Sequence, residues 1–167
     1  MEAMRTLILG LGNPILRDDA VGMVVARAVH ATVASPDVAL VEAAVAGLEA
    51  LDLIAGYDRV IVIDAIQTAA GAPGDLHRLS PDDLSTSTHL TTPHDVDFSL
   101  ALELGRHWGR PLPAEITIYA VEVADPYTFA EELSPEVAAR VPEIVRTIVA
   151  REFDGRLAPP ESQRRPA

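Results

Sequence analysis

Apolar residues follow two alternating patterns along this chain: short unbroken runs, and longer segments with the period of a helix. The short runs predict strands at residues 6–11, 38–45, 59–64, 75–79 and 115–123. The periodic segments predict helices at residues 19–33, 48–54, 95–108 and from residue 135 onward. The first and third runs are apolar almost throughout, which is typical of parallel strands covered on both faces. The alternation therefore predicts an α/β fold, a three-layer sandwich in which helices flank a mostly parallel twisted sheet.

Residues that favour the ends of helices refine these boundaries. Asp18 or Asp19 is expected to cap the first helix. Ser134 is expected to cap the last helix, with Pro135 in its first turn. Pro142 is expected to kink that helix or to split it in two.

Composition limits the chemistry of the chain. Its 167 residues are enough for one domain with a sizeable core, predicted at residues 1–154. Residues 80–93 read as a polar loop. Residues 155–167, rich in proline and arginine, are predicted to be a disordered tail. The chain has no cysteine, and all 13 of its basic residues are arginine. Thiolate ligands, cysteine nucleophiles and lysine Schiff bases are therefore excluded.

The charge and hydropathy of the chain narrow its partners and location. A net charge of −12 repels phosphate backbones and anionic lipid, so nucleic acid is not an expected partner. No apolar run reaches the roughly 18 residues that a membrane span requires, and the N-terminus lacks the pattern of a signal peptide. The expected location is cytoplasmic, without membrane association.

Three residues far apart in the sequence stand out as candidate ligands for one divalent metal ion. Asp19, Asp64 and His94 each occur where a strand should give way to a helix. In an open α/β sheet the active crevice lies outside the carboxyl ends of the strands, which can bring Asp19 and Asp64 together. His94 requires the preceding loop to fold back over the same edge. Two carboxylates and an imidazole suit a zinc, nickel or similar ion with open coordination positions.

Each of these residues also has a simpler interpretation. Asp19 is favoured in the first turn of a helix by the helix dipole alone. His94 is also explained by a helix-capping or solvated role that involves no metal. Asp64 is harder to explain without a function, because it ends an apolar strand. His89, in the same loop as His94, is the competing histidine ligand.

The glycine-rich turn before the acidic pair is a weaker signal. Gly10 and Gly12 lack the third glycine of a dinucleotide-binding fingerprint and are expected to let the backbone approach the site. Asn13 is expected either to orient substrate, together with Gly12, or to hold the turn by bonding to the backbone.

Together these stretches resemble the hydrogenase maturation proteases, which process the large subunit of nickel-iron hydrogenases. The resemblance rests on the turn from Gly10 to Asp19, on Asp64 followed by the turn at residues 71–74, and on His94 at a helix start. It covers roughly residues 4–152, and the glycine that follows the acidic pair in the family is Ala20 here.

The resemblance implies both an activity and a site. In the family, the residues that match Asp19, Asp64 and His94 bind a metal, and members are thought to recognise nickel already loaded into the precursor before they remove a C-terminal extension. The implied protein is a metal-dependent or metal-recognising endopeptidase of the aspartic grouping, with Asp19 and Asp64 as its catalytic residues. The attacking water would be activated either by an aspartate or by the metal. Nickel would arrive with the substrate, with zinc or cadmium as surrogates. A monomer or weak dimer is expected.

Two alternatives stay open from the sequence. Peptidyl-tRNA hydrolases also begin with a strand that leads into the turn found at residues 10–14, but that family needs a histidine near position 23, where this chain has Met23, and a basic groove. The other alternative is a chaperone that binds the hydrogenase precursor without cutting it.

Overall fold

Five strands form one sheet in the computed structural model, which describes residues 4–45, 47–86 and 95–155. The strands are β1 Thr6–Leu11, β2 Val38–Ala43, β3 Arg59–Ile66, β4 Leu76–Leu79 and β5 Glu115–Glu122. Their order across the sheet is β2-β1-β3-β5-β4. β1 runs parallel to β2 and β3, and β3 runs parallel to β5, whereas β4 pairs antiparallel with β5 at the edge. The predicted mostly parallel sheet and the edge position of the fourth strand are confirmed.

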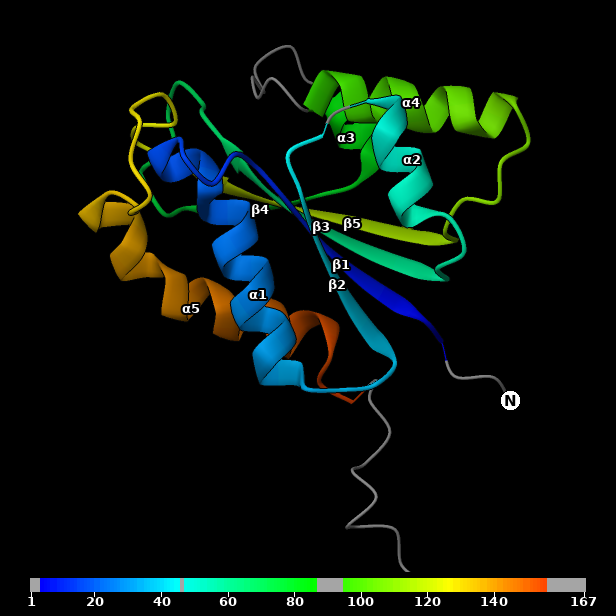
Figure 1. Ribbon diagram of the computed structural model, residues 1–167, viewed down its shortest axis with the longest axis horizontal. Coiled ribbons are helices and arrows are strands. Elements are labelled where there is room, and N and C mark those ends of the chain that lie inside the picture. Colours follow the sequence, from blue (N-terminus) through cyan, green and yellow to red (C-terminus); the bar gives the residue numbers. More distant parts are fainter. Residues whose placement is uncertain (1–3, 46, 87–94, 156–167) are drawn as a thin grey trace, which may run out of the picture.

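Helices cover both faces of this sheet, as predicted (Figure 1). They are α1 Val21–Val33, α2 Leu48–Ile54, α3 Pro81–Thr86, α4 Asp95–His107 and α5 Pro135–Glu152, with the 3-10 turn η1 Arg17–Ala20 before α1. α1 and α5 pack on one face, and α2, α3 and α4 lie on the other. None of the helices in the described ranges has the length and apolar character needed to cross a membrane.

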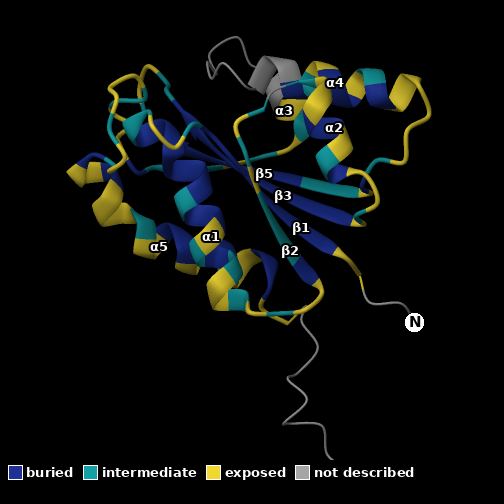
Figure 2. Ribbon diagram, in the orientation of Figure 1, coloured by how far each residue is buried: buried dark blue, intermediate teal, exposed yellow. Residues whose placement is uncertain are grey.

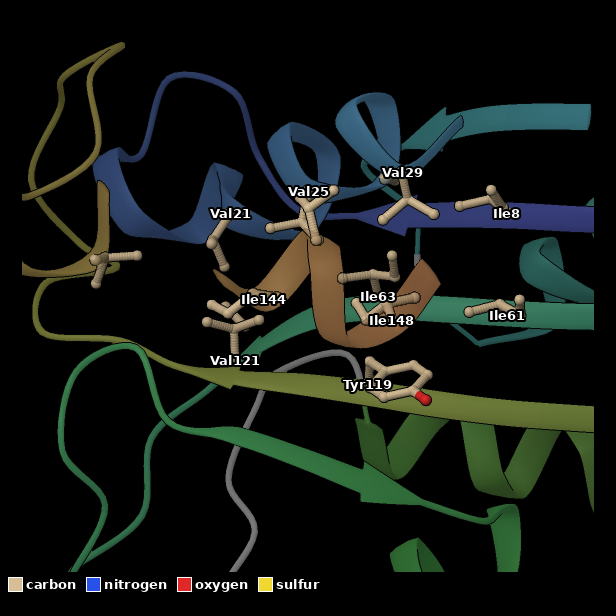
Figure 3. Close-up of a cluster of buried hydrophobic side chains, with 14 of the residues drawn as sticks. Ile8, Val21, Val25, Val29, Ile61, Ile63, Tyr119, Val121, Ile144 and Ile148 are labelled. Atoms are coloured by element: carbon tan, nitrogen blue, oxygen red, sulfur yellow. The ribbon is translucent and has the colours of Figure 1, made fainter. Parts of the chain in front are cut away.

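Alternating side chains of the central strands divide the core into two halves. Ile61 and Ile63 of β3 pack with α1 and α5, as Figure 3 shows, whereas Val60 and Val62 pack with α2 and α4. β1 and β3 are buried along their whole length (Figure 2), which explains their nearly continuous apolar sequence.

Several predicted boundaries are wrong. β3 does not end at Asp64 but continues to Ile66, because its ladder with β5 extends to that residue. The segment 80–93, expected to be a polar loop, contains α3, whose first turn carries two acidic residues that the helix dipole favours. Residues 87–93 of that segment lie outside the described ranges. α5 is one helix through Pro142, so a split is excluded, while the other predicted outcome, a kink, stays a prediction. The predicted tail lies outside the described residues except for Gly155.

A buried ionic cluster fastens the end of α5 to the sheet. The Arg59 guanidinium and the Glu152 carboxylate, each 1 % exposed, form an ion pair. Tyr119 Oη and Arg78 Nε donate to Glu152 Oε1 at 2.5 and 3.0 Å. Burial opposes ionisation of Glu152, but these hydrogen bonds and the nearby arginines outweigh it and lower its pKa. Burial raises the pKa of Tyr119 to about 12, so the phenol remains a donor at neutral pH.

Candidate active site at the carboxyl edge of the sheet

The turn that follows β1 holds Asp19 by close backbone contact. Gly12 has φ +145°, and a Cβ atom at this position would lie 2.0 Å from the Asp19 carbonyl oxygen. The Asn13 backbone N–H donates to Asp19 Oδ2 at 2.8 Å. The Asn13 side chain accepts from the Ile15 N–H at 3.2 Å, so it holds its own turn, one of its two predicted roles. Gly12 therefore lets the backbone approach the acidic residue, as the sequence indicates.

The start of α1 lies directly over the ends of β1 and β3. A Cβ atom at Gly22 would come within 2.3 Å of the Leu11 carbonyl oxygen and 2.4 Å of the Ile63 carbonyl oxygen. Only a glycine allows this approach. Asp19 lies three residues before Gly22 and Asp64 follows Ile63, and η1, which contains Asp19, contacts β3. The structure therefore brings the two predicted carboxylates to the same edge of the sheet.

Asp64 is a buried acid on the central strand of the sheet. Its exposed fraction is 1 %, and its Oδ1 accepts from the Ala65 N–H at 2.8 Å. Because side chains alternate along a strand, Asp64 faces the same side as Val62, toward α2 and α4. A carboxylate buried within an apolar strand is costly unless it is bonded or used in chemistry.

The third predicted ligand, His94, and its competitor His89 lie outside the described residues. The structure does describe α4, which begins at Asp95 directly after His94. Phe98 and Leu102 of α4 pack in the core on the face to which Asp64 belongs. α4 is followed within a few residues by the amino end of β5, so the start of α4 points back to the carboxyl edge (Figure 1). No group of three histidine, cysteine or acidic side chains in the described ranges is placed to hold a metal ion.

Asp18, the other acid of the pair, has a role that the sequence did not reveal. It is fully buried, and its carboxylate accepts four hydrogen bonds. Oδ1 accepts from the Ser134 N–H at 2.7 Å. Oδ2 accepts from Ser134 Oγ at 2.8 Å, from the Asp125 N–H at 2.9 Å and from the Ala124 N–H at 3.2 Å.

The prediction that Asp18 or Asp19 caps the first helix is wrong, and that for Ser134 is confirmed only for its position. Asp18 and Asp19 lie in η1, and Ala20 occupies the N-cap position of α1, where no side chain caps the helix. Ser134 occupies the N-cap position of α5 with Pro135 in its first turn, as predicted, but its hydroxyl binds Asp18 instead of capping the helix.

Glu122, at the carboxyl end of β5, is a second buried acid that the sequence analysis missed. Its side chain is 2 % exposed, and its carboxylate accepts a hydrogen bond from the Thr68 backbone N–H. It also accepts from Thr68 Oγ1 at 3.1 Å and from His77 Nε2 at 3.2 Å. A Cβ atom at Gly71 would lie 2.1 Å from Glu122 Cδ, so this glycine admits the carboxylate. These contacts order the turn after β3. The position of Glu122 at the end of an apolar run was the sequence feature from which its burial could have been predicted.

The fold and this edge define an open-sheet α/β protein with a buried acidic site. The chain belongs to the hydrogenase maturation protease family, whose HycI model matches residues 23–151. This assignment confirms the resemblance, and it favours the predicted hydrogenase endopeptidase over the peptidyl-tRNA hydrolase alternative.

Individual relatives agree with the family assignment. The hydrogenase 2 maturation protease of Escherichia coli K12 is 30 % identical over 151 residues, which cover 88 % of this chain and 90 % of that protein. The E. coli hydrogenase maturating endopeptidase HybD has a TM-score of 0.71 and 28 % identity, covering 89 % of this chain and 91 % of that one. The [NiFe] hydrogenase maturation protease HycI of Thermococcus kodakarensis has a TM-score of 0.64 and 26 % identity, covering 87 % and 90 %.

Proposed function

We propose that this endopeptidase removes the C-terminal extension from the precursor of a nickel-iron hydrogenase large subunit once nickel has been inserted. Family membership supports the reaction class and the partner. The observation that carries the proposal is the meeting of η1 with β3, since it brings two buried acids, Asp19 and Asp64, to one edge of the sheet. An acidic site at this edge is where an open α/β sheet places its chemistry.

The metal ligands in this proposal are Asp19, Asp64 and His94. The donor set fits a borderline ion such as nickel, with zinc or cadmium as surrogates, because it combines oxygen and imidazole nitrogen donors without a thiolate. The hydrogen bonds from Asn13 to Asp19 and from Ala65 to Asp64 orient the carboxylates, and such bonds are compatible with metal ligation. The direction of α4 supports His94 as the third ligand. In this view nickel is cargo of the precursor, and the site recognises it there.

The hydrolytic step in this proposal uses one of the two carboxylates as a base. Asp19 or Asp64 takes a proton from water, the water oxygen attacks the scissile carbonyl carbon, and the proton passes to the leaving nitrogen as the C–N bond breaks. This chemistry corresponds to the aspartic-type grouping. A cytoplasmic location and a monomeric or weakly dimeric state remain predictions from the sequence.

The choice between the two histidines gives a direct test. We expect His94→Ala to abolish removal of the extension from nickel-loaded precursor, and His89→Ala to retain it, because a residue adjoining a helix has the better fixed backbone. Mass spectrometry of the precursor before and after incubation measures the cleavage. Loss of cleavage in the His89 variant alone would show that His89, and not His94, is the histidine ligand. If the unsubstituted protein binds the precursor but leaves it intact, the chaperone alternative holds instead.

A further inference from the structure

Three large apolar side chains are exposed beside the acidic site. Tyr127 and Phe129, in the loop from β5 to α5, are 73 % and 80 % exposed, and Ile15, in the turn after β1, is 48 % exposed. Both segments lie at the carboxyl edge of the sheet, where Figure 2 shows exposed loops close together. The chain has only seven aromatic residues, so two on one loop are a marked concentration.

Backbone bonds join the two segments and fix them to η1. The Arg17 N–H donates to the Ala130 carbonyl at 2.8 Å, and the Ala130 N–H donates to the Ile15 carbonyl at 3.1 Å. Asp18 binds the same loop at Ala124 and Asp125. The exposed side chains are therefore carried on a backbone that is tied to the turn holding Asp19.

The aromatic segment is also ordered from within. Asp125 Oδ1 accepts from the N–H groups of Thr128 and Tyr127 at 3.0 and 3.1 Å, and Tyr127 Oη donates to Gln67 Oε1 at 3.1 Å. Hydrogen bonds from Thr128 and Tyr127 lower the pKa of Asp125, so its carboxylate holds the turn at neutral pH. An aromatic side chain on an ordered backbone, such as Tyr127, loses little conformational entropy on binding, and aromatic residues are frequent hot spots of protein interfaces.

The surroundings of these side chains are acidic. Residues 124–136 include four carboxylates and no basic residue, and one of the four, Asp125, pairs with Arg17 of η1 at 3.7 Å. Glu131 and Glu132 are exposed and line a pocket of about 510 Å³ that adjoins Ala130 and Arg17. A partner that covers Tyr127 and Phe129 therefore needs an apolar surface with basic side chains at its margin.

We propose that Ile15, Tyr127 and Phe129 form the docking surface for the hydrogenase precursor. The surface takes an apolar segment with basic flanks next to the scissile bond. This inference rests on the proposed function and specifies how the substrate is held. Because the docking surface shares its backbone bonds with η1, an occupant seated there is placed against Asp19.

Steady-state cleavage of nickel-loaded precursor tests the proposal. Tyr127→Ser and Phe129→Ser should each raise KM about tenfold and change kcat less than about twofold, because they weaken docking without altering the acids. The matched control is Trp108→Ser, which removes an aromatic side chain 55 % exposed just after α4, and it should leave KM within about twofold. Replacing Glu131 and Glu132 by glutamine should weaken the dependence of KM on salt.

Direct binding of the precursor, followed by biolayer interferometry, separates failure of the docking surface from failure of the proposed function. Unchanged KM and affinity in both serine variants would refute the docking surface. In that case, cleavage by the unsubstituted protein would still support the proposed endopeptidase function. Absence of cleavage by the unsubstituted protein, with weaker binding in the serine variants, would uphold the surface and refute the endopeptidase. If Phe129→Ser only converts a dimer into a monomer in sedimentation, the surface is for a second copy and the proposal is wrong. Equal melting temperatures exclude misfolding.

Discussion

Two neighbouring aspartates in η1 have different contacts. Asp18 is enclosed by donors from the β5–α5 loop and from the start of α5 and joins three parts of the fold. Asp19 is held by the Asn13 backbone at the candidate site. Asp18 therefore positions the loop, whereas Asp19 is the residue of the two on which the proposed chemistry depends.

We expect Asp18→Ala to lower the free energy of unfolding by about 3 kcal/mol, because it leaves several buried donors without their charged acceptor. Asp19→Asn should change that free energy by less than about 1 kcal/mol, because the amide oxygen can still accept from Asn13, while cleavage is lost. Urea unfolding of the two variants measures both effects. Equal destabilisation by the two changes would contradict this division of roles.

Only part of the site could be predicted from single residues. Asp64 is conspicuous because a charge interrupts an apolar strand. The role of Asp18 could not be found in this way, because its partners Ala124 and Ser134 are 106 and 116 residues away along the chain. Nothing in the sequence next to Asp18 distinguishes a residue that binds a distant loop from a residue that caps a helix.

At the level of elements, local patterns located the helices and strands but not all of their ends. β1 and α2 have the predicted limits because the apolar pattern itself ends there. β3 is longer than predicted because its last residues are set by pairing with β5, a long-range interaction. α5 continues through Pro142 since Val137 before it and Ile144 and Ile148 after it are buried on one face, which outweighs the cost of the missing hydrogen bond.

The attachment of α5 to the sheet should depend on pH through Glu152. Its pKa in the folded protein is lower than the ordinary 4.5, so the folded state binds fewer protons at this group than the unfolded state. The stabilisation is therefore fully present above about pH 4.5 and is lost as the pH falls through the lowered pKa.

Glu152→Gln should accordingly lower the free energy of unfolding by about 3 kcal/mol at pH 7, because it removes the buried anion that pairs with the buried Arg59 and leaves that guanidinium only the more exposed Glu115 as a charged partner. The difference from the unsubstituted protein should shrink as the pH falls below 4.5. Urea unfolding between neutral and acidic pH measures this difference. A difference that stays constant across that range would show that the charge of Glu152 does not stabilise α5. Glu143→Gln is a suitable control, since Glu143 lies in the same helix in an exposed pair with Arg140.

For the whole molecule, the sheet topology accounts for the position of the site. β2 is the neighbour of β1 on one side within the sheet, and the next strand along the chain, β3, is its neighbour on the other side. The direction in which strands are added therefore reverses between β1 and β3. Such a reversal is the usual place for the active crevice of an open α/β sheet. Asp19 follows β1 and Asp64 lies in β3, and the fold therefore brings together residues that the sequence separates.

The central claim is that this acidic edge cuts a precursor only after it has recognised nickel there. The most direct measurement follows the C-terminal extension by mass spectrometry after nickel-loaded or nickel-free precursor is mixed with the unsubstituted protein or with Asp64→Asn. We expect cleavage only by the unsubstituted protein and only of the loaded precursor, while Asp64→Asn remains folded because the amide keeps the shape of the carboxylate. Equal cleavage of both precursors, or a normal rate with Asp64→Asn, would contradict the account.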